Sequence, residues 1–128
     1  MSDDDRFERG VEMLEEVYAG AVPALPKGMM PAYDLMIETL FADVWSRDVL
    51  SIRDRRLLLM GVIAAQGQSD VWKIQARAAL DRGELTPDEL RETVVILAPY
   101  AGYPNAAALI GEAEGVIGEH QAAAADDG

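Results

Sequence analysis

The sequence contains no cysteine, only one histidine, and few aromatic residues, at 6% of the chain. The absence of cysteine excludes disulfides, zinc–thiolate sites and iron–sulfur clusters. It also excludes peroxide reduction by a cysteine thiol, because that reaction requires a thiolate. We therefore expect that the protein is not a thiol peroxidase. The absence of cysteine also fits a reducing compartment.

Positive charge is also scarce, with 11 Lys and Arg residues against 23 Asp and Glu residues and a formal net charge of -12. Such a chain repels phosphates, so we expect neither nucleic acid nor an anionic membrane as a partner. The N-terminus is acidic where a secretory signal is basic, and the longest apolar run, Leu57–Ala65, falls far short of the ~20 residues of a membrane span. We expect a soluble, cytoplasmic protein with acidic, solubilising ends at residues 3–5 and 126–127.

The hydrophobic residues recur with helical spacing. Phe7, Val11, Leu14 and Tyr18 share one face of a first helix that starts near Asp5. Later helices are expected from Pro31, from Ser51 to Gly67, from Ser69 to Gly83, from Thr86 to about Ala98, and from Pro104. Ser51 and Ser69 are the predicted N-caps of their helices. The sequence therefore predicts an all-α fold of about six helices in a single domain, 1–128, with a core at about 7–117 and a tail that frays after His120.

Local sequence signals mark several helix ends. Thr86 is followed by Pro87 and Glu89, which predicts a capping box with proline in the first turn. In the second helix, apolar residues predict a stripe of Met36, Ile37, Leu40, Phe41 and Val44. Alanines and glycines along the last helix, among them Gly111 and Gly115, predict a thin face that packs tightly.

The apolar content, 50% of residues, is high for about six short helices in a monomer. Surplus apolar surface is usually buried between subunits. We therefore expect an oligomer.

The only histidine, His120, is a candidate general base or metal ligand beside Glu119 and Glu112. However, adjacent helical residues point about 100° apart, so Glu119 and His120 do not converge. A solvated histidine at a helix end is the favoured interpretation. We expect no metal site and no cofactor.

Three arginines, Arg53, Arg55 and Arg56, gather at one helix start and are candidates for binding an anion, since arginine pairs with carboxylates in a bidentate manner. Surface or interface ion pairing is the alternative.

Four aromatic residues are candidate pocket residues. Trp45 and Trp72 fit a pocket lining, although large aromatic residues at helical spacing more often belong to a core or an interface. Tyr100 and Tyr103 flank Gly102, where a hydroxyl either faces a cavity or caps a helix end.

Several segments, in their order and spacing along the chain, together resemble the carboxymuconolactone decarboxylase family, which has an alkylhydroperoxidase D-like helical fold. Two of them, Phe7–Gly10 and Phe41–Arg47, resemble its decarboxylase branch. The others are Leu50–Ser51 with Arg53–Leu58, Gln75–Gly83, Thr86–Glu92 and Tyr100–Pro104. The resemblance implies homotrimers or homohexamers with a site between helices near a subunit interface.

The family's functional residues are not retained. The resemblance places Gln68 and Val71 where peroxidase members have two cysteines, and Gln75 where the family has its histidine. Arg56 stands where an acidic residue joins the proton relay. Glutamine can donate and accept hydrogen bonds but cannot act as an ordinary acid or base.

Two functions follow from these residues. The first is an enzyme or former enzyme of the decarboxylase branch, which acts on or binds a small anionic intermediate such as those of aromatic compound catabolism. The second is a catalytically silent, oligomeric binding protein. In the first, Gln75 orients the ligand and Arg55 binds its carboxylate. Val71 and Ala79 lie one helical turn to either side of Gln75 on a mostly apolar stripe, so we expect the Gln75 side chain to point into an interhelical cavity and not to solvent. The candidate binding residues are Gln75, Arg55, Arg56, Trp72, Tyr100 and Tyr103.

Overall fold

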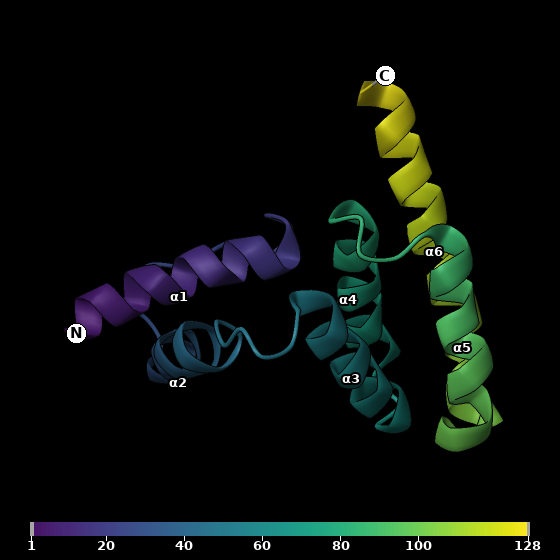
Figure 1. Ribbon diagram of the computed structural model, residues 1–128, viewed down its shortest axis with the longest axis horizontal. Helices are drawn as coiled ribbons and strands as arrows, with labels where there is room; N and C mark the ends of the chain where they lie inside the picture. Colours follow the sequence, from purple (N-terminus) through teal and green to yellow (C-terminus); the bar gives the residue numbers. More distant parts are fainter. Residues whose placement is uncertain (1, 128) are drawn as a thin grey trace. The chain divides into compact units, whose positions relative to one another are not determined.

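The computed structural model describes residues 2–127, and all regular structure in that range is helical. The elements are α1 (Asp3–Tyr18), α2 (Pro31–Leu35), the π-helix η1 (Met36–Val44), α3 (Ile52–Ala65), α4 (Ser69–Asp81), α5 (Pro87–Ala101) and α6 (Tyr103–Asp127), shown in Figure 1. Because η1 continues α2 without a break, these two elements form one continuous helical segment, and six such segments are present among the described residues. The predicted all-α fold of about six helices is confirmed.

The chain divides into two compact units, residues 1–55 and 56–128, which are described separately. The single domain expected from the sequence remains a prediction. Among residues 2–127, no helix is long and apolar enough to cross a membrane.

The first unit is built on the packing of α1 against η1. Helix α1 begins two residues earlier than Asp5, because the Ser2 hydroxyl accepts a hydrogen bond from the Asp5 amide over 3.2 Å. The backbones approach closely at Gly10, where an added Cβ would lie 2.1 Å from the Ile37 carbonyl oxygen. Glycine at this position is therefore required by packing.

The stripe predicted for the second helix is partly wrong. Ile37, Phe41 and Ala42 are buried, whereas Leu40 and Val44 are 39% and 48% exposed. A π-helix closes its hydrogen bonds from residue i to i+5, so buried positions no longer recur with the α-helical period.

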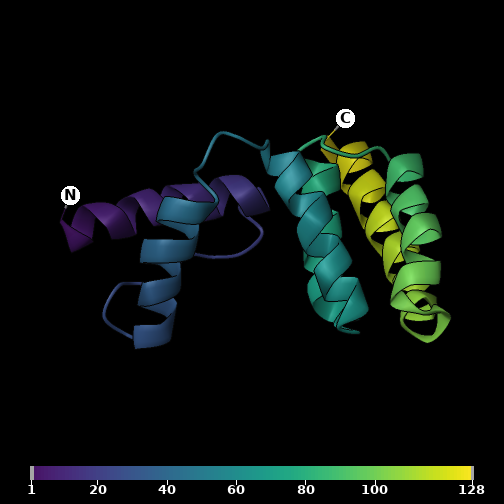
Figure 2. The same ribbon diagram turned by 60° about the horizontal axis from the view of Figure 1, so that its bottom comes forward.

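The second unit packs α4 and α5 against α6 (Figure 2). Its core includes residues from α3, α4, α5 and α6, such as Met60, Trp72, Leu90, Leu109 and Val116. The packing expected of the small residues of α6 is confirmed in part: α6 packs against α4 and α5, and Ala106 and Ala113 are buried. At Gly111 and Gly115, however, no atom from elsewhere in the described chain lies within 4 Å of an added Cβ. Helix α6 also continues to Asp127 rather than ending after His120; the side chains of Asp3 and Asp127, in the expected acidic ends, lie outside the described residues.

The predicted helix caps agree with the structure at two of three positions. Thr86 forms the capping box, accepting from the Glu89 amide over 3.1 Å and donating its own amide to the Glu89 carboxylate over 2.9 Å. The Ser51 hydroxyl accepts from the Asp54 amide over 3.0 Å. Ser69, however, does not cap α4: the N-cap residue is Gln68, which makes no side-chain capping bond.

Candidate functional site

The structure brings two of the predicted residues together inside the second unit. Gln75, in α4, is 2% exposed, and Arg56, in α3, is 1% exposed. The Arg56 Nη1 donates to Gln75 Oε1 over 2.8 Å. Gln75 points away from solvent, as predicted, and a guanidinium on another helix donates a hydrogen bond to its side-chain oxygen. The interhelical cavity expected beside Gln75 remains a prediction.

A carboxylate that the sequence did not suggest completes this site. Glu84 accepts from Arg56 Nε over 2.6 Å at one oxygen and from Arg56 Nη2 over 3.1 Å at the other. The second oxygen also accepts from Arg82 Nε over 2.6 Å. We call Arg56, Gln75, Arg82 and Glu84 the polar cluster.

The polar cluster keeps charge in the protein interior at a cost that only pairing offsets. A buried charge without a partner is strongly unfavourable, whereas a bidentate arginine–carboxylate pair satisfies both groups. The Arg56 side chain is 1% exposed and that of Glu84 is 7% exposed, while Arg82 reaches solvent with 24% of its side chain exposed. Pairing between Arg56 and Glu84 is therefore what allows both groups to lie in the interior.

Glu84 and Arg82 carry no sequence signal that links them to Arg56. Glu84 lies 28 residues from Arg56, in the turn between α4 and α5. The only local hint is a charged pair on either side of Gly83, directly after a helix end.

Arg55 and Arg53 have roles different from that of Arg56. The Arg55 guanidinium donates to the backbone carbonyls of Arg47 and Leu50 over 2.9 and 3.3 Å, and so holds the loop before α3. Arg53 lies 3.6 Å from the Asp54 carboxylate. Binding of a ligand carboxylate by Arg55 remains a prediction.

The aromatic candidates separate into core and surface. Trp72 is fully buried, and its Nε1 finds no hydrogen-bond partner among the described residues. Trp45 is 7% exposed and stacks on Phe41 with ring centroids 6.5 Å apart. Tyr100 and Tyr103 are 84% and 71% exposed, so these two rings lie at the surface of the second unit.

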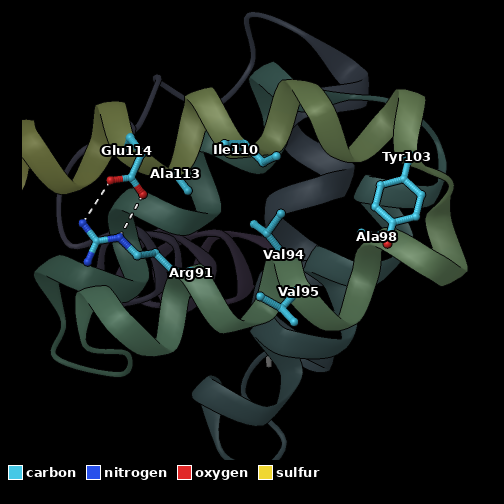
Figure 3. A pocket seen from close by; sticks show the side chains of 8 residues that line it. All are labelled: Arg91, Val94, Val95, Ala98, Tyr103, Ile110, Ala113 and Glu114. Carbon is cyan, nitrogen blue, oxygen red and sulfur yellow. Dashed lines mark hydrogen bonds and ion pairs between the residues drawn. The ribbon is translucent and has the colours of Figure 1, made fainter.

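A separate pocket of about 360 Å³ lies between α5 and α6 (Figure 3), and no residue of the polar cluster lines it. Its walls are mostly apolar. Tyr103 lies at one end of the view, and Arg91 and Glu114 pair at the other over 2.9 and 3.0 Å. This hydrogen bonding lowers the pKa of Glu114 and, with a bond to Asp88, raises the pKa of Arg91. The lining residues are Arg91, Val94, Val95, Ala98, Tyr103, Ile110, Ala113 and Glu114.

His120 is paired, though not with the residues expected. Its Nδ1 lies 2.8 Å from an Asp81 carboxylate oxygen, and Asp81 also accepts from Arg77 over 3.1 Å. His120 therefore belongs to a line of polar contacts between α4 and α6. Among the described residues, no group of three or more His, Asp or Glu side chains is arranged to hold a metal ion.

The two segments near the N-terminus that carried the resemblance contact each other in the first unit. The Arg9 Nη2 donates to the Ser46 hydroxyl over 3.1 Å, and Arg6 pairs with Asp43 over 2.6 Å. Arg9 and Ser46 belong to the two segments themselves, and Gly10 approaches the Ile37 backbone just before the second, so part of the pattern has a structural role in the first unit.

Comparison with known proteins identifies relatives over most of the chain. The sequence model of the carboxymuconolactone decarboxylase family matches residues 31–115. A 4-carboxymuconolactone decarboxylase of Acinetobacter baylyi is 29% identical over 122 residues, which cover 91% of this chain and 90% of that protein. A nitrosuccinic acid decarboxylase of Metarhizium robertsii is 31% identical over 96 residues, which cover 75% of this chain and 64%, less than two thirds, of that relative.

Proposed function

We propose, given that this chain belongs to the carboxymuconolactone decarboxylase family, that it acts on or binds a small carboxylic acid at the polar cluster. The observation that carries the proposal is the buried guanidinium of Arg56, held beside Gln75 in a chain with a net charge of -12. Both relatives described above are named as decarboxylases of small acids, which supports the same chemical class.

The residues of the cluster limit the chemistry that they can perform. Decarboxylation breaks the bond between carbon and the carboxylate, releases CO2 and leaves the electron pair on the remaining carbon. A fixed guanidinium can orient the acid and stabilise the negative charge that develops. Gln75 and Arg56 are not ordinary acids or bases at neutral pH, so the proton that replaces CO2 comes from water or another group.

Because neither Arg56 nor Gln75 is an ordinary acid or base, the site favours acids that lose CO2 without a strong base at residue 75. In such acids an electron-withdrawing group beside the reacting carbon takes up the electron pair. Gln75 then orients the substrate by hydrogen bonding, and the Arg56 cation balances the charge. We propose in addition that this protein belongs to the decarboxylase branch of its family and acts in the cytoplasm, in the catabolism of small acids.

The test measures binding and CO2 release with 4-carboxymuconolactone and nitrosuccinic acid, using calorimetry and a CO2 assay. We expect wild-type protein to bind one of them, and Gln75→Leu to weaken this binding. The matched control is Gln121→Leu, since Gln121 is an exposed residue of α6. The absence of both binding and CO2 release for the two acids would refute the proposal.

The alternative is a catalytically silent, oligomeric binding protein. It is favoured by the loss of an acid–base group at residue 75 and by exposed apolar residues beside the α5–α6 pocket, where Val95 and Ile110 are 62% and 58% exposed. Binding without release of CO2 from either acid would support it. In both alternatives we propose a homotrimer or homohexamer, and light scattering that gives a monomeric mass at micromolar concentration would contradict the assembly.

A further inference from the structure

Glu84 lies in a turn whose backbone is fixed on both sides. Helix α4 ends in a Schellman motif: Gly83 adopts a φ of 71°, its amide donates to the Leu80 carbonyl over 3.0 Å, and the Glu84 amide donates to the Ala79 carbonyl over 2.9 Å. After Glu84, Leu85 is buried and Thr86 begins the capping box of α5. The backbone that carries the Glu84 side chain is therefore held in one conformation.

The Glu84 carboxylate binds one edge of the Arg56 guanidinium through two hydrogen bonds. Its two oxygens accept from Nε over 2.6 Å and from Nη2 over 3.1 Å, and Nη1 donates to Gln75 over 2.8 Å. A bidentate pair sets the plane of the guanidinium as well as its position. The direction of Nη1 toward Gln75 therefore depends on where Glu84 is held.

We propose that Glu84 is a positioning residue of the site, which fixes the Arg56 guanidinium so that Arg56 and Gln75 together receive a ligand carboxylate. The inference rests on the proposed function for the ligand, but the positioning of Arg56 is testable without any ligand. Arg82 has a supporting role, because its Nε donates to Glu84 over 2.6 Å from the more exposed side.

Two substitutions separate positioning from simple charge balance. Glu84→Asp keeps the charge but shortens the reach by one methylene, whereas Glu84→Gln keeps the shape and removes the charge. If Glu84 were only a counter-ion, Asp would preserve ligand affinity and Gln would increase it, because a negative charge near the ligand is lost. If Glu84 positions Arg56, both variants weaken binding by roughly tenfold or more, as expected for a lost hydrogen bond to a charged group.

The experiment has two readouts. NMR follows the Nε–Hε resonance of Arg56 and the side-chain amide of Gln75 in ligand-free protein, and calorimetry titrates 4-carboxymuconolactone and nitrosuccinic acid. We expect both Glu84 variants to move both resonances, to speed the exchange of the Arg56 Nε proton with water, and to lower the affinity. Glu119→Gln is the matched control, since Glu119 pairs with Arg77 over 3.0 Å and its side chain is 50% exposed.

Each outcome decides one claim. Unchanged Arg56 and Gln75 resonances in both variants would overturn the positioning role, as would Asp with wild-type affinity together with Gln of higher affinity. If wild-type protein binds neither acid, the proposed function fails, while the resonances still decide whether Glu84 positions Arg56. If both Glu84 variants fail to fold, Arg82→Gln takes their place: we expect a smaller shift of the same Arg56 resonance, and no shift would overturn the inference.

Discussion

Gly10→Ala tests the close approach of α1 to η1 in the first unit. The Cβ of alanine would lie 2.1 Å from the Ile37 carbonyl oxygen, 2.6 Å from Ile37 Cγ2 and 2.8 Å from its carbonyl carbon. Real Cβ atoms essentially never come within 3.0 Å of another heavy atom. Two of these three atoms belong to the backbone, so a change of side-chain rotamer cannot relieve the overlap.

The expected magnitude is the balance of two terms. Alanine in a helix interior is favoured over glycine by about 1 kcal/mol, which alone would stabilise the variant. Overpacking against a fixed neighbour costs about 1–3 kcal/mol, and the cost lies at the upper end here because η1 must move as a whole. We therefore expect a net loss of about 2 kcal/mol, and for a chain of this size a fall in Tm of roughly 8 °C.

Thermal and urea unfolding, followed by circular dichroism, measure this change. Gly111→Ala is the matched control, because it is also a glycine inside a helix but its added Cβ meets no atom from elsewhere in the described chain within 4 Å. That variant should gain about 0.5–1 kcal/mol. If Gly10→Ala is as stable as Gly111→Ala, the reasoning from close packing is wrong.

Three further predictions follow from other features. Thr86→Ala should lose about 1 kcal/mol of unfolding free energy, because Thr86 caps α5, and an unchanged Tm would mean that the cap does not stabilise the helix. Arg91 lowers the pKa of Glu114 from 4.5, so the stability from this pair is present above that value and is lost as pH falls through the lower folded pKa; Glu114→Gln should therefore show a weaker loss of Tm below about pH 4.5 than wild type. With no cysteine in the chain, metal-free protein should not reduce an organic hydroperoxide in the presence of a dithiol, and measured turnover would contradict this.

The parts of the fold that could be predicted from sequence are those set by local interactions. The capping box at Thr86 depends on residues three positions apart. The regular period of α1 correctly predicts Phe7 and Leu14 as buried, whereas Val11 and Tyr18 of the same predicted face are half-buried. The π-helical hydrogen bonding of η1 could not be predicted in this way, since the apolar pattern was read with an α-helical period and the bond from the Trp45 amide to the Leu40 carbonyl spans five residues.

Local sequence also does not predict which helical glycines are required by packing. Gly10 and Gly111 both stand inside helices, and nothing in the neighbouring residues tells them apart. Gly10 lies against the Ile37 backbone, whereas the Cβ position of Gly111 has no such neighbour in the described chain. The need for glycine is set by the distance to a segment far along the sequence, which local patterns do not contain.

The candidate site was predicted in part. Gln75 was expected to be buried because Val71 and Ala79 lie one turn to either side of it, and this was correct. The pairing of Gln75 with Arg56, and of Arg56 with Glu84, could not be foreseen, because Arg56 and Glu84 reach the cluster from α3 and from the turn after α4. Burial follows from a periodic pattern, but the pairing of buried charges follows from tertiary structure.

The hydrogen bond between Arg56 and Gln75 also defines what residue 75 does in this chain. Arginine only donates hydrogen bonds, so the side chain at position 75 must present an acceptor to Arg56 Nη1, and Gln75 Oε1 does so over 2.8 Å. An imidazole placed here would accept only in its neutral form, and a nearby guanidinium disfavours the protonated form. A protonated imidazole at residue 75 is therefore incompatible with Arg56 in its present orientation. Under the proposed function, the site works by charge stabilisation from the Arg56 guanidinium, and acid–base chemistry at residue 75 would require changes at Arg56 and Gln75 together.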